Sequence, residues 1–212
     1  MSIVHALLSL TWVYEMVSNS VARVILEQLS GGALPDWPVA AAALQTKRVA
    51  PGHYLFRTGD AARSVFFVTE GFVKMVYETR DGQEWIKAFA GKNMFFASLS
   101  ALQPKGAASF SALALGHTVV EQMDYQTIVT LADRHIEWQR VLARAFEIYG
   151  SRKEMRERAL LTQSPEERYR SFLREHPDIA AQISQKDLAG YIRITPVALS
   201  RIKSRVKRAG PV

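Results

Sequence analysis

The sequence predicts an α+β fold in which a segment of short strands lies between helical segments. Three observations carry this prediction. Short apolar runs separated by turn residues fill residues 47–124, residues 133–162 keep a helical apolar spacing without proline, and residues 164–208 contain three capped helix starts. The chain has 212 residues, 48% of them hydrophobic, which is enough for one domain or two modest ones.

The composition limits the function before any motif is considered. The chain has no cysteine, which excludes disulfides, thiolate metal sites and thiol nucleophiles and favours a cytoplasmic location. Its net charge of +7 falls entirely within residues 151–212, which hold 14 basic and 7 acidic residues. This asymmetry indicates a basic module that meets a polyanion, attached to a neutral module with another task. The alternative is a solvated basic helix face.

The N-terminal segment is expected to be helical as far as Leu29. Its apolar residues recur at helical spacing from Val13 to Leu29, and Gly31-Gly32 ends the pattern. Residues 1–17 are too short and too polar for a membrane span, so no membrane partner is expected. A further short helix is expected over residues 39–44.

Strands are predicted by four apolar and aromatic runs with turn residues between them: residues 53–56, 64–68, 72–77 and 85–89. Spacings of this kind are typical of an all-β sandwich or barrel. Asp81-Gly82, between the last two runs, predicts a hairpin.

A long helix is predicted over residues 133–162. Its apolar and flanking positions follow a heptad-like 4-3-4-3-4 spacing, which makes it a candidate dimer interface: Val141, Ala145, Ile148, Arg152, Met155 and Ala159. The alternative is an amphipathic helix that lies on its own domain.

Three helix starts follow this helix. Ser164-Pro165 with Glu167 forms a capping box, Ser184 with Asp187 caps a second helix, and Thr195-Pro196 opens a third. The last two helices are predicted to share a small core made by Leu188, Ala189, Ile192, Ile194, Leu199 and Ile202. Two short helices across a tight turn predict a helix-turn-helix, whose second helix enters the major groove of DNA.

The residues expected to contact DNA lie on the outer faces of these two helices and in the turn: Ser184, Gln185, Lys186, Arg193, Thr195, Pro196, Val197, Ser200, Arg201, Lys203 and Arg205. Arg201 is the candidate base reader, because a guanidinium can bind guanine O6 and N7 together. The first amides of the helix capped by Ser184, with Lys186 beside them, are expected to bind a phosphate. Between Arg193 and Arg208 there are six basic residues and no acidic one.

Taken together, these segments resemble the Crp/Fnr family of bacterial transcription regulators over residues 45–208. The resemblance implies three parts: residues 1–132 with N-terminal helices and a sensor of the cyclic-nucleotide-binding type, residues 133–162 as a dimerisation helix, and residues 163–212 as the DNA-binding domain. The sensor would be a double-stranded β-helix, that is, a jelly-roll-like β-roll. The implied partners are double-stranded DNA, a second copy of the chain, a small-molecule effector and RNA polymerase.

The expected effector pocket departs from the family pattern. The Gly-Glu dipeptide and the Arg that hold a cyclic nucleotide fall on Ala97-Ser98 and Ala108, which supply neither the carboxylate nor the guanidinium. The pocket is expected to be lined by small and apolar residues: Phe96, Ser98, Leu99, Ala108, Ser109 and Phe110. Binding of cAMP in the usual way is therefore not expected. We expect instead that the pocket binds an uncharged or lipophilic ligand, or no ligand. The alternative is a cAMP- or cGMP-responsive regulator with relocated anchors.

Two departures concern the DNA-binding segment. Arg193 stands where many relatives have Gly, in a turn that favours a left-handed conformation, and we expect its side chain to reach a DNA phosphate. Val197 stands where a Glu is common, so an apolar contact to a thymine methyl is expected.

No enzyme chemistry is expected from this sequence. Its five histidines are scattered without metal-ligand spacing, and no glycine-rich phosphate loop is present. Neither a metal nor a cofactor is expected; haem with His117 or His53 as a ligand is the alternative. A ligand-binding module that acts through another protein is the remaining alternative function.

Overall fold

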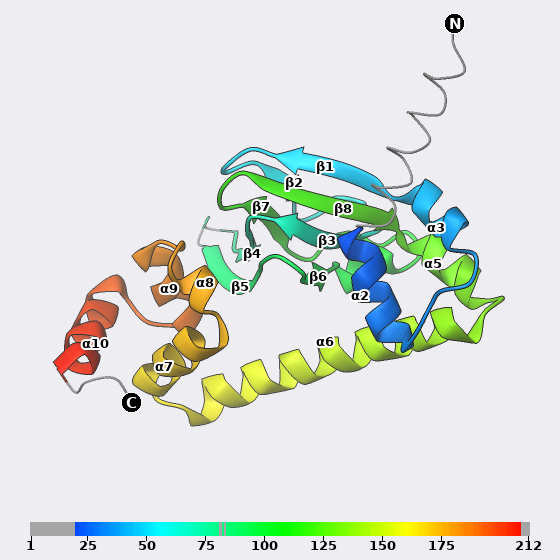
Figure 1. The fold of residues 1–212 in the computed structure, drawn as a ribbon. Helices are drawn as coiled ribbons and strands as arrows, with labels where there is room; N and C mark the ends of the chain where they lie inside the picture. Colours follow the sequence, from blue (N-terminus) through cyan, green and yellow to red (C-terminus); the bar gives the residue numbers. More distant parts are fainter. Residues whose placement is uncertain (1–19, 81, 83, 209–212) are drawn as a thin grey trace, which may run out of the picture.

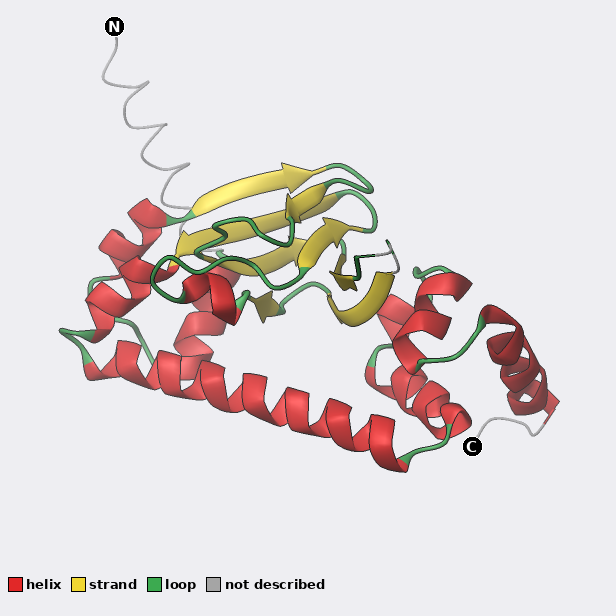
Figure 2. Ribbon diagram, turned by 180° about the vertical axis from the view of Figure 1, so that it is seen from behind, coloured by secondary structure: helices red, strands yellow, loops and turns green. Residues whose placement is uncertain are grey.

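The computed structural model describes residues 20–80, 82 and 84–208. Eight strands of this part of the chain form a β-roll, a long helix runs along one side of the roll, and a group of short helices follows (Figures 1 and 2). The predicted α+β class with a jelly-roll-like β-roll and C-terminal helices is confirmed. None of the helices within these residues is long and apolar enough to cross a membrane.

The roll consists of two antiparallel four-stranded sheets. One sheet has the order β1-β8-β3-β6 and the other β2-β7-β4-β5. The strands are β1 (Gln45–Val49), β2 (Tyr54–Phe56), β3 (Ser64–Glu70), β4 (Val73–Glu78), β5 (Glu84–Ala90), β6 (Phe95–Phe96), β7 (Ser111–Ala114) and β8 (Thr118–Asp124). Each of the four predicted runs overlaps a strand. β4 and β5 pair from Val73↔Ala90 to Glu78↔Glu84, as a hairpin requires; Asp81 of the predicted turn lies outside the described residues.

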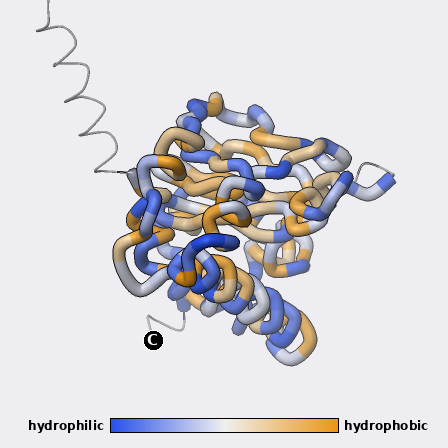
Figure 3. The backbone as a smooth tube through the Cα atoms, turned by 90° about the vertical axis from the view of Figure 1, so that its right-hand side faces the viewer, coloured by the Kyte–Doolittle hydropathy of each residue, from blue (hydrophilic) through white to orange (hydrophobic). Residues whose placement is uncertain are grey.

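The interior of the roll is filled with its own aromatic side chains. Phe66 and Phe96 stack with ring centroids 5.3 Å apart, and Phe56 lies 5.4 Å from both Phe66 and Phe110. Hydrophobic and hydrophilic residues alternate over short distances along the elements (Figure 3), as expected when each element buries one face.

The predicted N-terminal helix is interrupted at Ser20. Helix α2 (Val21–Ser30) begins after Ser20, whose backbone is extended and whose hydroxyl accepts a hydrogen bond from the Arg23 amide at 3.2 Å. A continuous helix through this point is therefore wrong, because Ser20 acts as an N-cap that the periodicity concealed. Val13 and the rest of residues 1–19 lie outside the described residues. Helix α3 (Trp37–Ala43) starts two residues before the predicted 39–44 helix.

The long helix predicted over residues 133–162 is one helix that begins three residues later than expected, after a separate shorter helix. Helix α5 (Tyr125–Ala132) ends at Asp133, and helix α6 (Ile136–Thr162) runs without interruption for 27 residues, through Gly150. Its first turns are anchored by Trp138, which is fully buried and donates to the Pro35 carbonyl at 2.9 Å. A one-turn helix, α4 (Leu99–Leu102), lies in the roll.

The C-terminal helices begin where the capping residues predict. Helix α7 (Pro165–Glu175) carries the full capping box of Ser164 and Glu167, and Ser184 accepts from the Asp187 amide at the start of α9 (Gln185–Ile192). Thr195 Oγ1 accepts from the Ala198 amide at 3.2 Å at the start of α10 (Pro196–Arg208). The one-turn helix α8 (Pro177–Ala180) was not predicted.

Helices α7 and α9 pack against the outer face of the β4–β5 strand pair, and α10 packs on α9. One apolar cluster contains Val76, Ile86 and Phe89 from the strands together with residues of α7, α9 and α10. A Cβ atom at Gly190 would lie 3.2 Å from Ile86, so the glycine allows α9 to approach β5 closely. At the same contact Lys74 Nζ lies 2.9 Å from Asp187 Oδ1, and both side chains are largely buried.

Candidate nucleic-acid interface

Helices α9 and α10 form the predicted helix-turn-helix. Five of the six predicted core residues are at least 95% buried, and Ile194 is partly buried. The turn closes through the Ile194 amide, which donates to the Ala189 carbonyl at 3.0 Å. Arg193 at the turn has φ 64° and ψ 49°, the left-handed conformation that the sequence indicated.

The outer face of α10 is open and basic. Pro196, Val197, Ser200, Arg201 and Arg205 are exposed, Lys203 is partly exposed, and α10 lies at the outer end of the molecule (Figure 1). Within the described residues, the Arg201 side chain has no hydrogen bond or ion pair, so it is available to an external acceptor. Such a guanidinium near the start of a recognition helix can read guanine.

Two other bases on this helix are held by neighbouring helices. Lys203 Nζ donates to Gln185 Oε1 at 3.0 Å, which links α10 to α9. Arg205 Nε lies 3.2 Å from Glu166 Oε2 on α7. The hydrogen bonds from Arg170 and Arg205 lower the pKa of Glu166, so the carboxylate stays charged. These two bases are therefore oriented before any ligand arrives.

The start of α9 is also exposed. Ser184, Gln185 and Lys186 are all on the surface, and the Ser184 hydroxyl is occupied by the Asp187 amide and carboxylate. The remaining first-turn amides and Lys186 suit a phosphate oxygen. Asp187 would oppose such a phosphate, but its carboxylate is paired with Lys74.

The Arg193 side chain is engaged within the chain. Its guanidinium carbon lies 3.9 Å from the centroid of the Trp85 ring on β5. The sequence analysis expected this side chain to reach a DNA phosphate and did not predict the contact with Trp85. The two residues are too far apart in the sequence for spacing to indicate it. Instead, Arg193 links the helix-turn-helix to the roll.

Two more basic residues of the positively charged C-terminal segment bind the C-terminal end of α9. Arg156 donates to the Tyr191 carbonyl, and Arg168 Nε donates to the Ile192 carbonyl at 3.0 Å. These are the last carbonyls of α9, which lack partners within the helix. Sequence reasoning missed this role, since it counted both residues only as positive charge.

The predicted effector pocket has little free space. Ser98, Ala108 and Phe110 are each at least 97% buried, and Phe96 is 92% buried. The Ser98 hydroxyl accepts from the Ser109 amide at 3.2 Å, and the Ala108 amide donates to the Asp60 carbonyl at 2.8 Å. Ser109 is exposed and Leu99 partly exposed. Neither Ser98 nor Ala108 supplies the carboxylate or the guanidinium that a cyclic nucleotide would need, and the degenerate effector pocket stays a prediction.

The predicted dimer seam faces the roll. Val141 is 98% buried in its own chain, in the cluster that includes α2, so it is not on a free surface. The other five residues line the space between α6 and the roll: Ala145, Ile148, Arg152, Met155 and Ala159. The large apolar residues Phe146, Met155 and Leu161 are exposed by 47%, 53% and 78%. Phe146 and Met155 line the same space between α6 and the roll, whereas Leu161 does not, and dimerisation through α6 stays a prediction.

Comparison with known families now identifies the roll. Residues 46–135, which span β1 to β8 and α5, match the family description "Cyclic nucleotide-binding domain". The solved structures that resemble most of the chain include Crp/Fnr family transcription regulators. This chain has the Crp/Fnr fold.

Three solved structures illustrate the Crp/Fnr fold of this chain. FixK2 from Bradyrhizobium japonicum has 21% identity and a TM-score of 0.66, with 79% of this chain and 86% of that one covered. The c-di-GMP responsive regulator CLP of Xanthomonas campestris has 15% identity and a TM-score of 0.63, with 80% and 89% covered. The Thermus thermophilus catabolite activator protein has 24% identity and a TM-score of 0.51, with 86% and 90% covered. No curated protein sequence matches the chain.

Proposed function

We propose that this chain is a transcription regulator that binds double-stranded DNA as a homodimer through α9 and α10. The observation that carries the proposal is α10 itself, a capped 13-residue helix at the outer end of the molecule with an exposed face free of acidic residues. The first 150 residues, which include the roll, carry no net charge, so the basic excess is confined to the part of the chain that contains α10. The fold shared with catabolite activator protein and FixK2 supports the same function.

In this proposal the two recognition helices of a dimer occupy successive major grooves about 34 Å apart and read a pseudo-palindrome. Arg201 reads a base, and Val197, which is 63% exposed, contacts a thymine methyl. Lys186 and the first amides of α9 bind phosphate. The exposed apolar residues of α6 form the dimer contact.

The test is a selection of bound duplexes from a random DNA library, followed by affinity measurements with Arg201→Ala and Lys203→Ala. We expect Arg201→Ala to lose about 1–3 kcal/mol on the selected duplex and to become less selective. Lys203→Ala should weaken selected and scrambled duplexes alike, because its contact is with the backbone. Affinity for both should fall steeply as salt rises.

Lys92→Ala is the matched control, since Lys92 is exposed in a turn of the roll, outside α9 and α10. An Arg201→Ala protein that keeps its full preference for the selected duplex would remove Arg201 as base reader. A protein that binds no duplex at low salt would overturn the DNA-binding proposal and favour action through a protein partner.

A further inference from the structure

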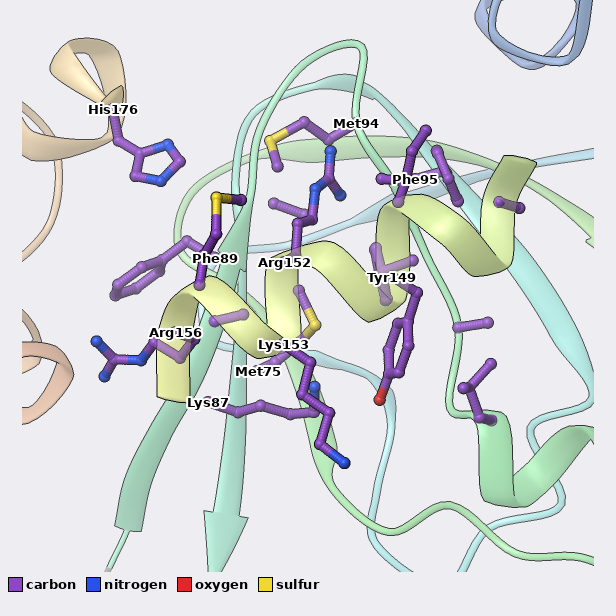
Figure 4. Close-up of a pocket in the computed structure, with 18 of the residues that line it drawn as sticks. Met75, Lys87, Phe89, Met94, Phe95, Tyr149, Arg152, Lys153, Arg156 and His176 are labelled. Carbon is purple, nitrogen blue, oxygen red and sulfur yellow. The ribbon is translucent and has the colours of Figure 1, made fainter. Parts of the chain in front are cut away.

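A cleft separates helix α6 from strands β4, β5 and β6 of the roll, and residues of α7 and α9 line one end of it (Figure 4). Seven basic residues line this cleft. Two of them, Arg156 of α6 and Arg168 of α7, donate to the last carbonyls of α9. The end of the first helix of the helix-turn-helix is therefore held by guanidinium groups from two other helices.

Arg156 makes two contacts with the same residue of α9. Its guanidinium carbon lies 4.0 Å from the centroid of the Tyr191 ring, and the same group donates to the Tyr191 carbonyl. Figure 4 shows its side chain extending from α6 toward the C-terminal helices. Across residues 20–80, 82 and 84–208, this is the only hydrogen bond between α6 and α9. A planar guanidinium that stacks on a ring and donates to a carbonyl has a fixed orientation, so the contact restricts rotation of α9 relative to α6.

Tyr191 is the residue at which α6, α7 and the roll meet α9. Its ring centroid lies 4.9 Å from that of Phe172 on α7 and 5.5 Å from that of Phe89 on β5. Burial raises the pKa of the Tyr191 phenol, and the Arg156 guanidinium beside it opposes this rise. A rotation of α9 would separate the ring from neighbours on three other elements.

The position of the end of α9 also determines where α10 begins. Tyr191 lies four positions before Thr195, whose hydroxyl caps the first turn of α10. The turn between them is closed by the hydrogen bond from the Ile194 amide, and the two helices share one buried core. A recognition helix meets base edges with its N-terminal residues. Arg156 therefore acts close to the part of α10 that would enter the groove.

Arg156 lies on the helix that forms the dimer contact in the proposed function. Because α6 runs without interruption from Ile136 to Thr162, the position of Arg156 follows that of the whole helix. Arg168 reinforces the same junction, since it donates both to the Gln163 carbonyl, directly after α6, and to the Ile192 carbonyl at the end of α9. Both arginines thus join α6 or its end to the end of α9, and Arg156 is the one that belongs to α6 itself.

We propose that Arg156 is a positioning residue, which fixes the direction of α10 relative to α6 and thereby selects the spacing between the two half-sites that a dimer reads. Each added base pair moves the half-sites about 3.4 Å further apart and turns them by about a tenth of a turn, so two rigidly held recognition helices fit one spacing. The selection of spacing rests on the proposed function. The direction of α10 does not, and it is measured without DNA.

The direction of α10 is tested by pulsed electron paramagnetic resonance on the full chain. Because the sequence contains no cysteine, Arg140→Cys on α6 and Ser204→Cys on α10 provide two unique and exposed sites for nitroxide labels. Labelled protein is diluted with excess unlabelled protein, so that distances between two copies do not contribute. We expect a narrow distance distribution in the presence of Arg156 and a broader one in Arg156→Met. Arg156→Lys should be intermediate, because it keeps the charge and a donor but not the planar group.

The spacing is tested by measuring affinity for the selected duplex and for versions whose central spacer is one base pair longer or shorter. Arg156→Met should lose about tenfold of the wild-type preference for the selected spacing, the effect of losing one hydrogen bond to a charged group. Its affinity for a duplex with a single half-site should be unchanged, because the outer face of α10 is intact. Arg158→Met is the matched control: Arg158 is exposed on α6, its side chain has no hydrogen bond or ion pair in the described part of the chain, and the change removes the same charge.

An unchanged distance distribution in Arg156→Met would overturn the proposal whether or not the protein binds DNA. A broader distribution with the wild-type spacing preference would overturn the selection of spacing. An equal effect of Arg158→Met, or an equal loss on the single half-site, would assign the result to charge and would also overturn it. Circular dichroism reports the folding of each variant, and Arg156→Gln takes the place of Arg156→Met if methionine prevents folding. If no duplex is bound at low salt, the proposed function fails, while the distance measurement still decides the role of Arg156 in directing α10.

Discussion

Replacing Arg193 by glycine tests two opposing contributions to stability at one position. The left-handed backbone at φ 64° costs a residue with a Cβ atom about 1–2 kcal/mol, which glycine avoids. Glycine in turn loses roughly 0.5–1 kcal/mol through its more flexible unfolded state. It also loses the guanidinium contact with Trp85 at 3.9 Å, which contributes about 0.5–1 kcal/mol at an exposed site.

These contributions nearly cancel, so Arg193→Gly should change the free energy of unfolding by less than about 1 kcal/mol. The backbone contributions are the same whether or not the ring is present. In a Trp85→Leu background, therefore, Arg193→Gly should stabilise the protein by about 0.5–1 kcal/mol more than it does in wild type. That difference is the energy of the contact between the roll and the helix-turn-helix.

The assay is urea unfolding followed by circular dichroism for wild type, both single variants and the double variant. Circular dichroism is used because the Trp85 substitution alters fluorescence. Arg193→Lys serves as a control that keeps the charge and the left-handed strain. A coupling energy below about 0.3 kcal/mol, the limit for independent sites, would refute the argument that Arg193 is held by Trp85.

Two further predictions concern the C-terminal helices. Ser164→Ala should lower the free energy of unfolding, measured in urea, by about 1 kcal/mol, because it removes the acceptor of the Glu167 amide. Ser164→Asp should keep most of this stability, since an aspartate oxygen can accept the same hydrogen bond. Equal losses of stability in the two variants would contradict the capping role. Burial, which outweighs the Glu175 carboxylate, holds the pKa of His176 below its ordinary value of 6.5. The unfolded chain thus takes up this proton at higher pH than the folded chain, so stability should fall as pH drops below about 6.5 and level off below the folded pKa. His176→Gln should show a smaller fall in denaturation scans at each pH, and an identical fall would contradict the assignment.

Local patterns predicted much of the fold. The capping residues Ser164, Ser184 and Thr195 each begin a helix in the structure, because an N-cap is satisfied by amides two or three residues away. The core of the helix-turn-helix was predictable for the same reason, because its residues lie close together in the sequence. Ser20 was missed since the apolar spacing runs across it, even though its hydroxyl caps α2 in the same way.

The candidate site depends on contacts that sequence spacing does not encode. The stacking of Arg193 on Trp85 and the pairing of Lys74 with Asp187 join residues about a hundred positions apart. Ala108 is buried in the roll, as its apolar side chain allows, but the cleft beside α6 arises only when the helix lies against β5. The sequence analysis assigned the basic residues that line this cleft to the positive charge of a DNA-binding module.

The Lys74–Asp187 pair joins the β-roll to the C-terminal helices. Lys74 also lies 3.5 Å from Glu84, whose side chain is 41% exposed, but Asp187 is its close partner. A chimera that joined this roll to C-terminal helices without an acid at position 187 would leave Lys74 paired only with Glu84, which is 3.5 Å away and 41% exposed. The chimera would therefore lose the closer and more buried of the two ion pairs of Lys74. Substitutions on the outer face of α10 therefore leave this pair intact, whereas an exchange of all the C-terminal helices requires matched changes in β4 and β5.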